Sequence, residues 1–366
     1  MNLETHLKQK SISVFRQPEI FRPRTLFLWR PMSKHNIHTL AKLAGVSAAT
    51  VSRVLNGNPQ VKAHLKEKVL QALQETGFQP DPKAQSLRAG KTRTVSIILP
   101  MVDTDFYRRL LWAMESVFEP AGYDLGLYPL VGSLKTRRYQ QATALPYQGD
   151  GLILSSLNLS TLYNGLPIPF QKPTVLVDTQ HEGHASFCID NFWGGVQAAR
   201  HLCSFPEPMV LIGLRQDLTS PFVSPVLQAR YNGIQHGLKL HGRTLAGAEY
   251  VDLTTEGGRQ AARGWFQHHP EPCQFLCMAD TVALGVLRHV REQGLPARVL
   301  GFDDHTFAAK EGLSSVAQPI EEMGKQAAQH LLNLLEGHPA EPIQVVLPPE
   351  LVVRESSLHL SERRTL

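Results

Sequence analysis

Short apolar runs alternate with helical patterns from residue 94 onward, and this alternation constrains the fold more than any other feature. The apolar runs are 95–99, 124–128, 151–154, 174–177, 209–212, 275–278 and 299–302. Helical patterns lie between them, as at 106–120, 191–203, 225–240, 255–268 and 281–293. Strands that alternate with helices form parallel sheets with helices on both faces. The sequence therefore predicts an α/β body of two doubly wound lobes, and its apolar runs are far shorter than the ~20 residues of a membrane span.

A different pattern precedes the body, because residues 36–56 have the pattern of a helix-turn-helix. Leu40, Leu43 and Ala44 are spaced so that one face of a short first helix is apolar. Gly45 follows them and can end the helix, since glycine adopts the left-handed backbone without steric cost. The sequence predicts an all-α head at this end of the chain.

The second helix of this head has an outer face suited to DNA. Ser47 can cap its start, and Val51, Val54 and Leu55 turn inward. The residues that can face outward are Ala48, Ala49, Ser52, Arg53 and Asn56. Small and polar residues at the start of a helix, followed by an arginine one turn later, fit the major groove.

A third helix is predicted over 61–76, ended by Gly77, with Phe78 returning an aromatic ring to the small core. Its expected inner face consists of Val61, Leu65, Val69, Leu70 and Leu73.

Charge is divided unevenly along the chain. Residues 1–94 hold 16 Lys and Arg and 5 Asp and Glu, a net charge of +11. The whole chain is +5, so residues 95–366 carry −6. A basic head on an acidic body is typical of a DNA-binding module joined to a domain that does not bind nucleic acid.

The stretch 44–56, Ala-Gly-Val-Ser-Ala-Ala-Thr-Val-Ser-Arg-Val-Leu-Asn, resembles the signature of the Lac repressor family of bacterial regulators almost residue for residue. The likeness continues over about 94–357, where its markers are 188–191, 301–304, 318–324 and 347–356. The resemblance implies a two-lobed body with the periplasmic sugar-binding fold. It also implies that the chain crosses between the lobes near Asp190, Gln318 and Leu347.

The resemblance assigns DNA contacts to the head and to the linker that follows it. Arg53 could fork to guanine or reach a phosphate, and Ala48 and Ala49 suit thymine methyl groups. Ser47, Thr50 and Asn56 would bind phosphates, and Ser52 shares the outward face. In the family, the segment 80–94 is a hinge helix that orders on operator DNA. Leu87 would be wedged into the minor groove there, or would instead pack on the body. Asp81 departs from the asparagine common in the family.

The resemblance also implies an effector site between the lobes. Asp178, Arg230 and Asp303 would contact the effector, Gln318 would contact it or brace the lobes, and Phe106 and Tyr107 would stack on it or wall it. Such a set suits a polyol, because carboxylates accept from hydroxyls and an aromatic face covers a sugar ring.

Each of these assignments has a structural alternative. Arg230 could pair with a surface carboxylate, Asp304 could point inward in place of Asp303, and the two aromatic residues could be ordinary core residues. Asp280 is expected to cap the following helix rather than bind ligand. Two departures from the family, Ala279 and the loop 215–228, reshape the cleft wall, so no particular effector is predicted.

The predicted organisation has five parts. Residues 1–31 are interpreted as a disordered arm or an artefact of start-site choice, 32–79 as the DNA-binding domain and 80–94 as the hinge. Residues 95–357 form the effector-binding and dimerisation domain, and 358–366 are a tail too short for a tetramerising coiled coil.

The predicted function is a sequence-specific DNA-binding regulator, a repressor, acting as a cytoplasmic, nucleoid-associated homodimer on operator DNA under a carbohydrate effector. The alternatives are a solute-binding protein of a transport system and a DNA binder without an effector. No enzyme motif, membrane partner, cofactor or metal site is expected. Four cysteines without zinc or redox spacing, interpreted as buried free thiols, are Cys188, Cys203, Cys273 and Cys277.

Overall fold

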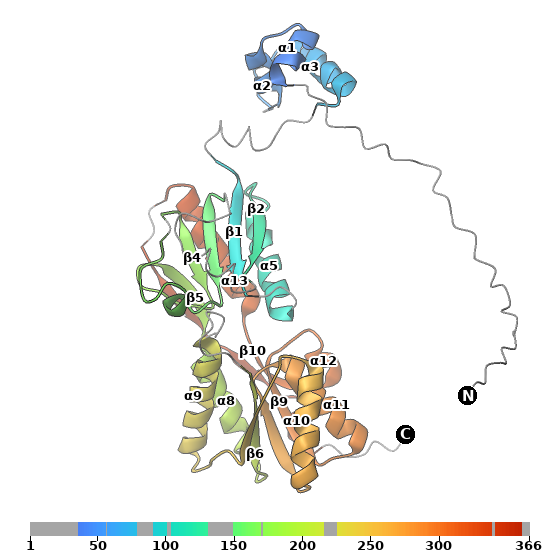
Figure 1. Ribbon diagram of the computed structural model, residues 1–366, viewed down its shortest axis with the longest axis vertical. Helices are drawn as coiled ribbons and strands as arrows, with labels where there is room; N and C mark the ends of the chain where they lie inside the picture. The colour runs from blue at the N-terminus through green and yellow to red at the C-terminus, as the bar shows by residue number, and fades with distance from the viewer. Residues whose placement is uncertain are drawn as a thin grey trace, which may run out of the picture. The chain divides into compact units, whose positions relative to one another are not determined.

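The computed structural model describes residues 36–55, 57–78, 91–100, 104–130, 149–169, 171–215, 225–338 and 341–360 (Figure 1). The chain divides into two units, 1–85 and 86–366. The division falls inside the segment predicted as a hinge, and the domain boundaries given above remain predictions.

The first unit contains a three-helix head. Its helices are α1 (Ile37–Ala44), α2 (Ala48–Leu55) and α3 (Ala63–Thr76). The Asn36 side chain caps α1 by accepting from two amides of its first turn, at 2.9 and 3.0 Å. Gly45 ends α1 with a φ of 62°, as its position in the sequence predicts.

The core of the head is smaller than the sequence suggested. Its buried residues are Leu40, Ala41, Ala44, Val51, Val54, Val69 and Ala72. Leu43 is 57% exposed and Leu70 is 44% exposed, so both expected core positions are wrong. Each lies about 100° around its helix from a buried neighbour, and such short helices bury only a narrow stripe. The third helix also begins two residues later than expected.

The first lobe of the body is built on a six-stranded sheet in which every pairing is parallel. Its order is β11-β5-β4-β3-β1-β2. The strands are β1 (Thr94–Leu99), β2 (Asp124–Pro129), β3 (Gly151–Ser155), β4 (Thr174–Val177), β5 (Ala185–Ile189) and β11 (Gln344–Leu347). Two helices, α5 (Asp105–Phe118) and α13 (Ile320–Leu335), pack together on one face over a core of Val, Ile and Leu side chains. A second cluster, which includes the short α7 (Leu159–Leu162), covers the other face.

The second lobe repeats this plan, with the order β12-β10-β9-β8-β6-β7. Its strands are β6 (Met209–Leu214), β7 (Gly247–Val251), β8 (Cys273–Cys277), β9 (Ala297–Asp303), β10 (Ser314–Ala317) and β12 (Glu350–Val352). Among the described strands of this lobe, β10 and β12 pair antiparallel and the other pairs are parallel, so the predicted architecture of two doubly wound lobes is confirmed.

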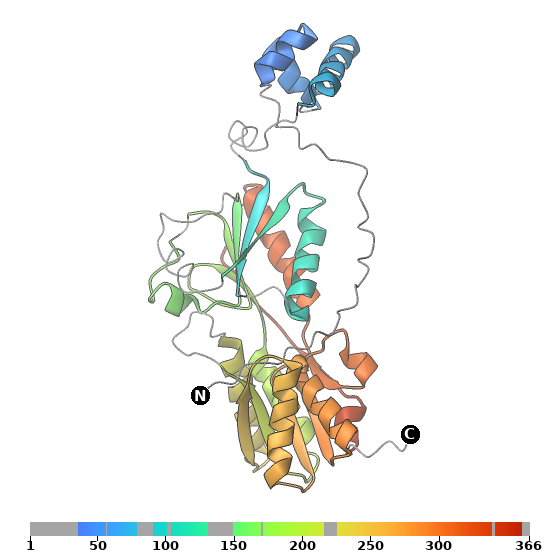
Figure 2. The same ribbon diagram turned by 45° about the vertical axis from the view of Figure 1, so that its right-hand side comes forward.

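Helix pairs cover both faces of this second sheet (Figure 2). The pairs are α8 (Asn191–Leu202) with α9 (Pro225–Leu240), and α10 (Thr255–His268) with α11 (Asp280–Gln293). Two short helices complete the lobe, α12 (Ala308–Glu311) and α14 (Glu355–Leu358). Two of the four cysteines, Cys273 and Cys277, are buried, whereas Cys188 and Cys203 are only partly so.

The chain passes between the two sheets three times: from β5 into α8, from β10 into α13, and from β11 into β12. These positions confirm the crossings predicted near Asp190, Gln318 and Leu347. Each of these strands leaves its sheet at its carboxyl end, so the carboxyl ends of the strands in both lobes face the crossings. Ligands of doubly wound sheets bind at such ends. Among the described helices, none combines the length and apolar character needed to cross a bilayer.

Candidate functional site

The exposed surface of α2 carries the residues predicted to contact DNA. The Ser47 hydroxyl accepts from the Thr50 amide at 3.1 Å and lies 2.9 Å from the Thr50 hydroxyl, so Ser47 caps α2 as expected. Ala49 and Arg53 are exposed. An exposed arginine on a capped helix is free to enter a groove.

The other predicted DNA contacts lie in less exposed or undescribed positions. Ala48 is half-buried against the head core, and Ser52 is also half-buried. Asn56 and Leu87 lie outside the described residues.

In the body, Arg230 is the centre of a buried polar cluster. Its Nε donates to Asn191 Oδ1 at 2.8 Å, Nη1 to the Met278 carbonyl at 2.7 Å, and Nη2 to Asp303 Oδ1 at 2.9 Å. The guanidinium carbon also lies 4.1 Å from the centre of the Phe302 ring. Arg230 therefore pairs with another predicted effector residue, and not with a surface carboxylate.

Close packing of α8 on α9 places Arg230 beside Asn191. A Cβ atom at Gly233 would lie 2.0 Å from the Phe192 carbonyl oxygen, and one at Gly195 would lie 2.3 Å from the Arg230 carbonyl oxygen. Only glycine permits this approach of the two backbones.

The Asp303 carboxylate collects several partners at the end of β9. Gln318 Nε2 donates to Oδ1, and His305 Nε2 lies 3.7 Å from Oδ2. Asp304 points elsewhere and forms an ion pair with Arg354 at 2.6 Å. Asp303 is therefore the inward-facing residue of the two.

Asp178 lies in the same electrostatic environment at the end of β4. Burial raises the pKa of its carboxyl group to about 6, against a hydrogen bond from the Ser156 hydroxyl at 2.7 Å and the attraction of Arg230. The negative charge of Asp303 raises the pKa further. The cluster thus contains groups from both lobes.

Tyr107 is buried near these acids, and Phe106 is half-buried beside it. Burial raises the pKa of the Tyr107 phenol, with the charges of Asp178 and Asp303 adding to the effect. The rings of Phe106 and Tyr107 meet edge to face at 5.1 Å between centroids. The structure thus brings together Tyr107, Asp178, Arg230, Asp303 and Gln318, with Phe106 packed on Tyr107.

Four residues around the cluster have left-handed backbones. Ser156 follows β3 with a φ of 54°, Asp178 follows β4 with 56°, and Asp303 and Asp304 at the end of β9 have 105° and 46°. Such conformations cost free energy outside glycine and concentrate at ligand sites. The backbone is strained where the two lobes approach each other.

Asp280 has a structural role that differs from the expected helix cap. Its carboxylate accepts from the Ser315 hydroxyl at 2.7 Å and the His305 amide at 2.8 Å. The N-cap position of α11 is Ala279, whose side chain makes no capping hydrogen bond. Gly301 leaves room for this arrangement, since a Cβ there would lie 2.1 Å from Asp280 Oδ1.

Sequence reasoning missed three members of the cluster: Asn191, Ser156 and His305. Asn191 closes the family marker 188–191, and Ser156 lies just after the predicted strand 151–154, so each had a signal in the sequence. His305 follows Asp304 in the chain, and only the fold brings it to the acids.

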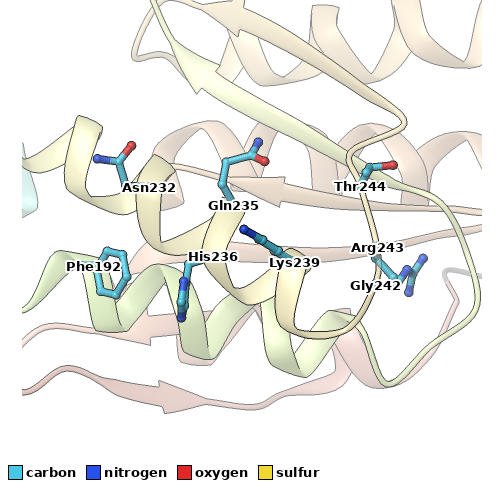
Figure 3. Close-up of a pocket in the computed structure, with 8 residues that line it drawn as sticks. All are labelled: Phe192, Asn232, Gln235, His236, Lys239, Gly242, Arg243 and Thr244. Atoms are coloured by element: carbon cyan, nitrogen blue, oxygen red, sulfur yellow. The ribbon is translucent and has the colours of Figure 1, made fainter.

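A cavity of about 640 Å³ lies elsewhere, on the outer side of α9 (Figure 3). It contains none of the predicted effector residues and is lined by Phe192, Asn232, Gln235, His236, Lys239, Gly242, Arg243 and Thr244. Within the described part of the chain, no group of three or more His, Cys, Asp or Glu side chains could hold a metal ion.

Known proteins share both parts of this architecture. Residues 36–81 match the bacterial regulatory proteins of the lacI family, and residues 209–357 match the periplasmic binding protein-like domain. The ribose operon repressor of Haemophilus influenzae is 27% identical over 87% of this chain and 97% of that protein.

Two solved structures resemble the chain as well. The crystal structure of a probable transcription regulator from Thermus thermophilus is 38% identical, with a TM-score of 0.63 over 72% of this chain and 97% of that one. The complex of the transcriptional regulator CelR with cellobiose is 27% identical, with a TM-score of 0.63 over 88% of this chain and 100% of that one.

The three-helix head corresponds to the first family match, and the second lobe lies within the second family match. The protein belongs to the lacI family of bacterial regulatory proteins, which are DNA-binding regulators of transcription and not enzymes.

Proposed function

We propose that this protein is a repressor that binds a near-palindromic operator as a homodimer and responds to a small neutral polyol held at the buried cluster. The observation that carries the proposal is the presence, in one chain, of an exposed Arg53 on a capped helix and a buried, strained set of polar residues at the carboxyl ends of strands from both lobes.

On the DNA side, α2 would enter the major groove. Arg53 would fork to guanine or bind phosphate, and Ala48 and Ala49 would contact thymine methyl groups. Ser47 and Thr50 would bind phosphates through the hydroxyl pair at the start of α2.

The remaining DNA contacts are proposed from the family pattern. Ser52 and Asn56 would add to the α2 surface, and Leu87 would be wedged into the minor groove at the operator centre.

On the effector side, the cluster offers more acceptors than donors. Arg230 has five N–H groups and directs three of its nitrogens to protein acceptors. Gln318 Oε1 is buried and has no hydrogen-bond partner among the described residues. Asp178 receives one hydrogen bond, from Ser156, on Oδ2.

A ligand that satisfies this cluster must bring hydroxyl or amine donors. Unpaired buried acceptors cost free energy, so hydroxyl groups directed at Gln318 Oε1 and Asp178 would be bound selectively. A phosphate or carboxylate would face the charges of Asp178 and Asp303 and would be excluded. The relative CelR, solved with cellobiose, supports a sugar.

The homodimer is supported by an exposed aromatic residue on the first lobe. The Trp112 side chain on α5 is 71% exposed, with Arg108 stacked 5.8 Å from its ring centre. Tryptophan is enriched at protein interfaces, and two heads on a twofold axis would match two half-sites.

The alternative of a DNA binder without an effector has two observations in its favour. Ala279 contributes no polar group at the start of α11, and Arg230 is already bonded within the protein. A ligand titration separates the two possibilities.

The experiment is selection of genomic fragments bound by the full chain at moderate salt, followed by titration of the recovered operator complex with neutral sugars, cellobiose and ribose among them. One shared palindrome and a sugar-dependent change in DNA affinity support the proposal. Binding that shares no sequence and only falls with salt would contradict sequence-specific regulation. If the protein recovers one palindrome but its DNA affinity does not change with any neutral sugar, the repressor function stands and the polyol effector is wrong.

A further inference from the structure

The first turns of α5 join the two lobes through hydrogen bonds to residues 303–306, at the end of β9 and just after it. Asp105 Oδ2 accepts from the Thr306 amide at 3.1 Å. Arg109, one turn later, donates from Nη1 to the carbonyl oxygens of Asp303 at 3.4 Å and Asp304 at 3.3 Å. Asp105 and Arg109 belong to the first lobe, and their partners belong to the second.

Both side chains are largely buried, and each also binds a residue of its own lobe. Asp105 is 12% exposed and Arg109 is 17% exposed. Arg109 donates from Nε and Nη2 to the Glu321 carboxylate at 2.6 and 2.7 Å. Glu321 lies in the first turn of α13, just after the chain has crossed from the second lobe.

We propose that Asp105 and Arg109 form an interlobe latch that holds the lobes together before any ligand binds and positions Asp303 for the effector. This inference rests on the proposed function of the cluster and adds two positioning residues to it. The latch is defined as Asp105 and Arg109 with the segment 303–306.

The geometry links the latch to the effector site in two ways. Phe106 and Tyr107, the predicted ligand wall, lie between Asp105 and Arg109 on α5, so α5 cannot move away from 303–306 without moving the wall. Arg109 also binds the carbonyl of Asp303 itself, whose backbone has a φ of 105°. A strained residue persists only where its surroundings fix it.

A further contact supports Asp105 as a charged acceptor. Burial alone would raise the pKa of Asp105, but hydrogen bonds from Arg108 and the Thr306 amide lower it below its usual value. The carboxylate that receives the Thr306 amide is therefore ionised at neutral pH, which strengthens the hydrogen bond.

The latch is tested in the full chain without any ligand. The amide of Thr306 donates to the other lobe, whereas the adjacent amide of His305 donates to Asp280 within its own lobe, at 2.8 Å. Amide hydrogen exchange resolved to single residues compares these two neighbours. We expect Asp105→Ala to speed exchange at Thr306 roughly tenfold or more while His305 keeps its protection.

A conservative variant and an unrelated one complete this arm. Asp105→Asn keeps an acceptor oxygen and should restore part of the protection at Thr306. Glu115→Ala, which changes an exposed side chain further along α5, should leave it unchanged. Rapid exchange at Thr306 in the unaltered protein, or equal exchange in the Asp105→Ala variant, would overturn the latch.

The second arm asks whether the latch affects ligand binding, with cellobiose and ribose as probes. For whichever of these sugars binds the unaltered protein, Arg109→Met should lower the affinity roughly tenfold. This is the effect of losing one hydrogen bond to a charged group. The sugar affinity of Arg109→Lys should lie between those of the unaltered protein and Arg109→Met. The matched control is Arg259→Met, which removes an Arg–Glu pair of 2.6 and 2.9 Å contained within the second lobe.

The two proposals fail in distinguishable ways. If no neutral sugar binds but Thr306 exchange responds to Asp105→Ala, the polyol is wrong and the latch stands. If a sugar binds and Arg109→Met binds it as tightly as Arg259→Met does, the positioning role of Arg109 is wrong.

Discussion

Arg230 on α9 and Asp303 at the end of β9 bind each other at 2.9 Å, although the sequence suggested that each would contact the ligand. Both side chains are buried, and Gln318 completes the coordination of the acid. The ion pair is formed between groups of the protein itself, and it sets the shape and charge of this buried cluster.

Removing one partner of this pair should be more harmful than removing both charges. Arg230→Ala leaves the Asp303 carboxylate buried without its cation, and we expect a loss of about 3–5 kcal/mol in the free energy of unfolding. The double variant Arg230→Met with Asp303→Asn should lose clearly less. Urea unfolding followed by circular dichroism measures both, and equal losses would show that the ion pair carries no special weight.

The pKa of Asp178 predicts a pH-dependent stability. Its value rises from 3.8 to about 6 on folding, so the folded protein holds this proton more tightly than the unfolded chain. The resulting contribution of Asp178 to the free energy of unfolding is fully present below about pH 4. It is lost as the pH rises through about 6, and its size is ~3 kcal/mol.

Asp178→Asn stays neutral and should escape that loss. The melting temperature of the variant should therefore rise relative to the unaltered protein between pH 4 and pH 7. The exposed change Asp252→Asn serves as control. A difference that is independent of pH would show that Asp178 titrates normally.

Two glycines provide a matched test of packing. In Gly301→Ala the new Cβ would lie 2.1 Å from Asp280 Oδ1, so we expect a loss of ~1–3 kcal/mol from overpacking. Gly264 on α10 has nothing within 4 Å, and Gly264→Ala should stabilise the helix by ~0.5–1 kcal/mol. Thermal unfolding of both variants should give shifts of opposite sign.

Arg53 is predicted to read sequence. Arg53→Ala should reduce discrimination between the operator and variants at one base pair by ~1–3 kcal/mol, measured by competition binding. The exposed α3 change Lys66→Ala should leave this discrimination unchanged. A loss that is equal for all DNA sequences would assign Arg53 to a phosphate.

Trp112 is predicted to support the homodimer. Trp112→Ala should shift sedimentation of the protein toward the monomer at low micromolar concentration. The control Leu240→Ala removes a side chain that is 65% exposed on the second lobe. This variant should sediment as the unaltered protein does. A dimer unchanged by Trp112→Ala would place the interface elsewhere.

The sequence predicted the bounds of five long body helices, α5, α8, α9, α10 and α11, to within two residues, but it did not predict α13. The bounds of α9 and α10 coincide with the expected 225–240 and 255–268, because both patterns end at loop residues. The strands β5, β7, β10, β11 and β12 were not predicted. The strands β7 and β11 lie at sheet edges and are partly exposed, so they are formed by pairing with a neighbouring strand and not by an apolar run.

The sequence predicted single residues of the candidate site, but it did not predict how these residues bind one another. Strand ends locate Asp178 and Asp303, since the carboxyl ends of parallel strands meet at one edge. Which acid faces inward is decided by Arg354, which binds Asp304 from a segment 50 residues away. Likewise, nothing in the sequence indicates that Arg230 is bonded to Asn191, because this contact depends on the close packing of two helices.

The three crossings have a consequence for biosynthesis. Strand β11, which pairs with β5, and helix α13, which covers the core of the first lobe, are both translated after β6 to β10. When residues 94–189 leave the ribosome, they expose an unpaired sheet edge and an uncovered apolar face, both prone to aggregation. The first lobe to be synthesised cannot be completed until residue 347 has emerged, so a nascent chain that stalls within the second lobe holds two unfinished domains instead of one finished one.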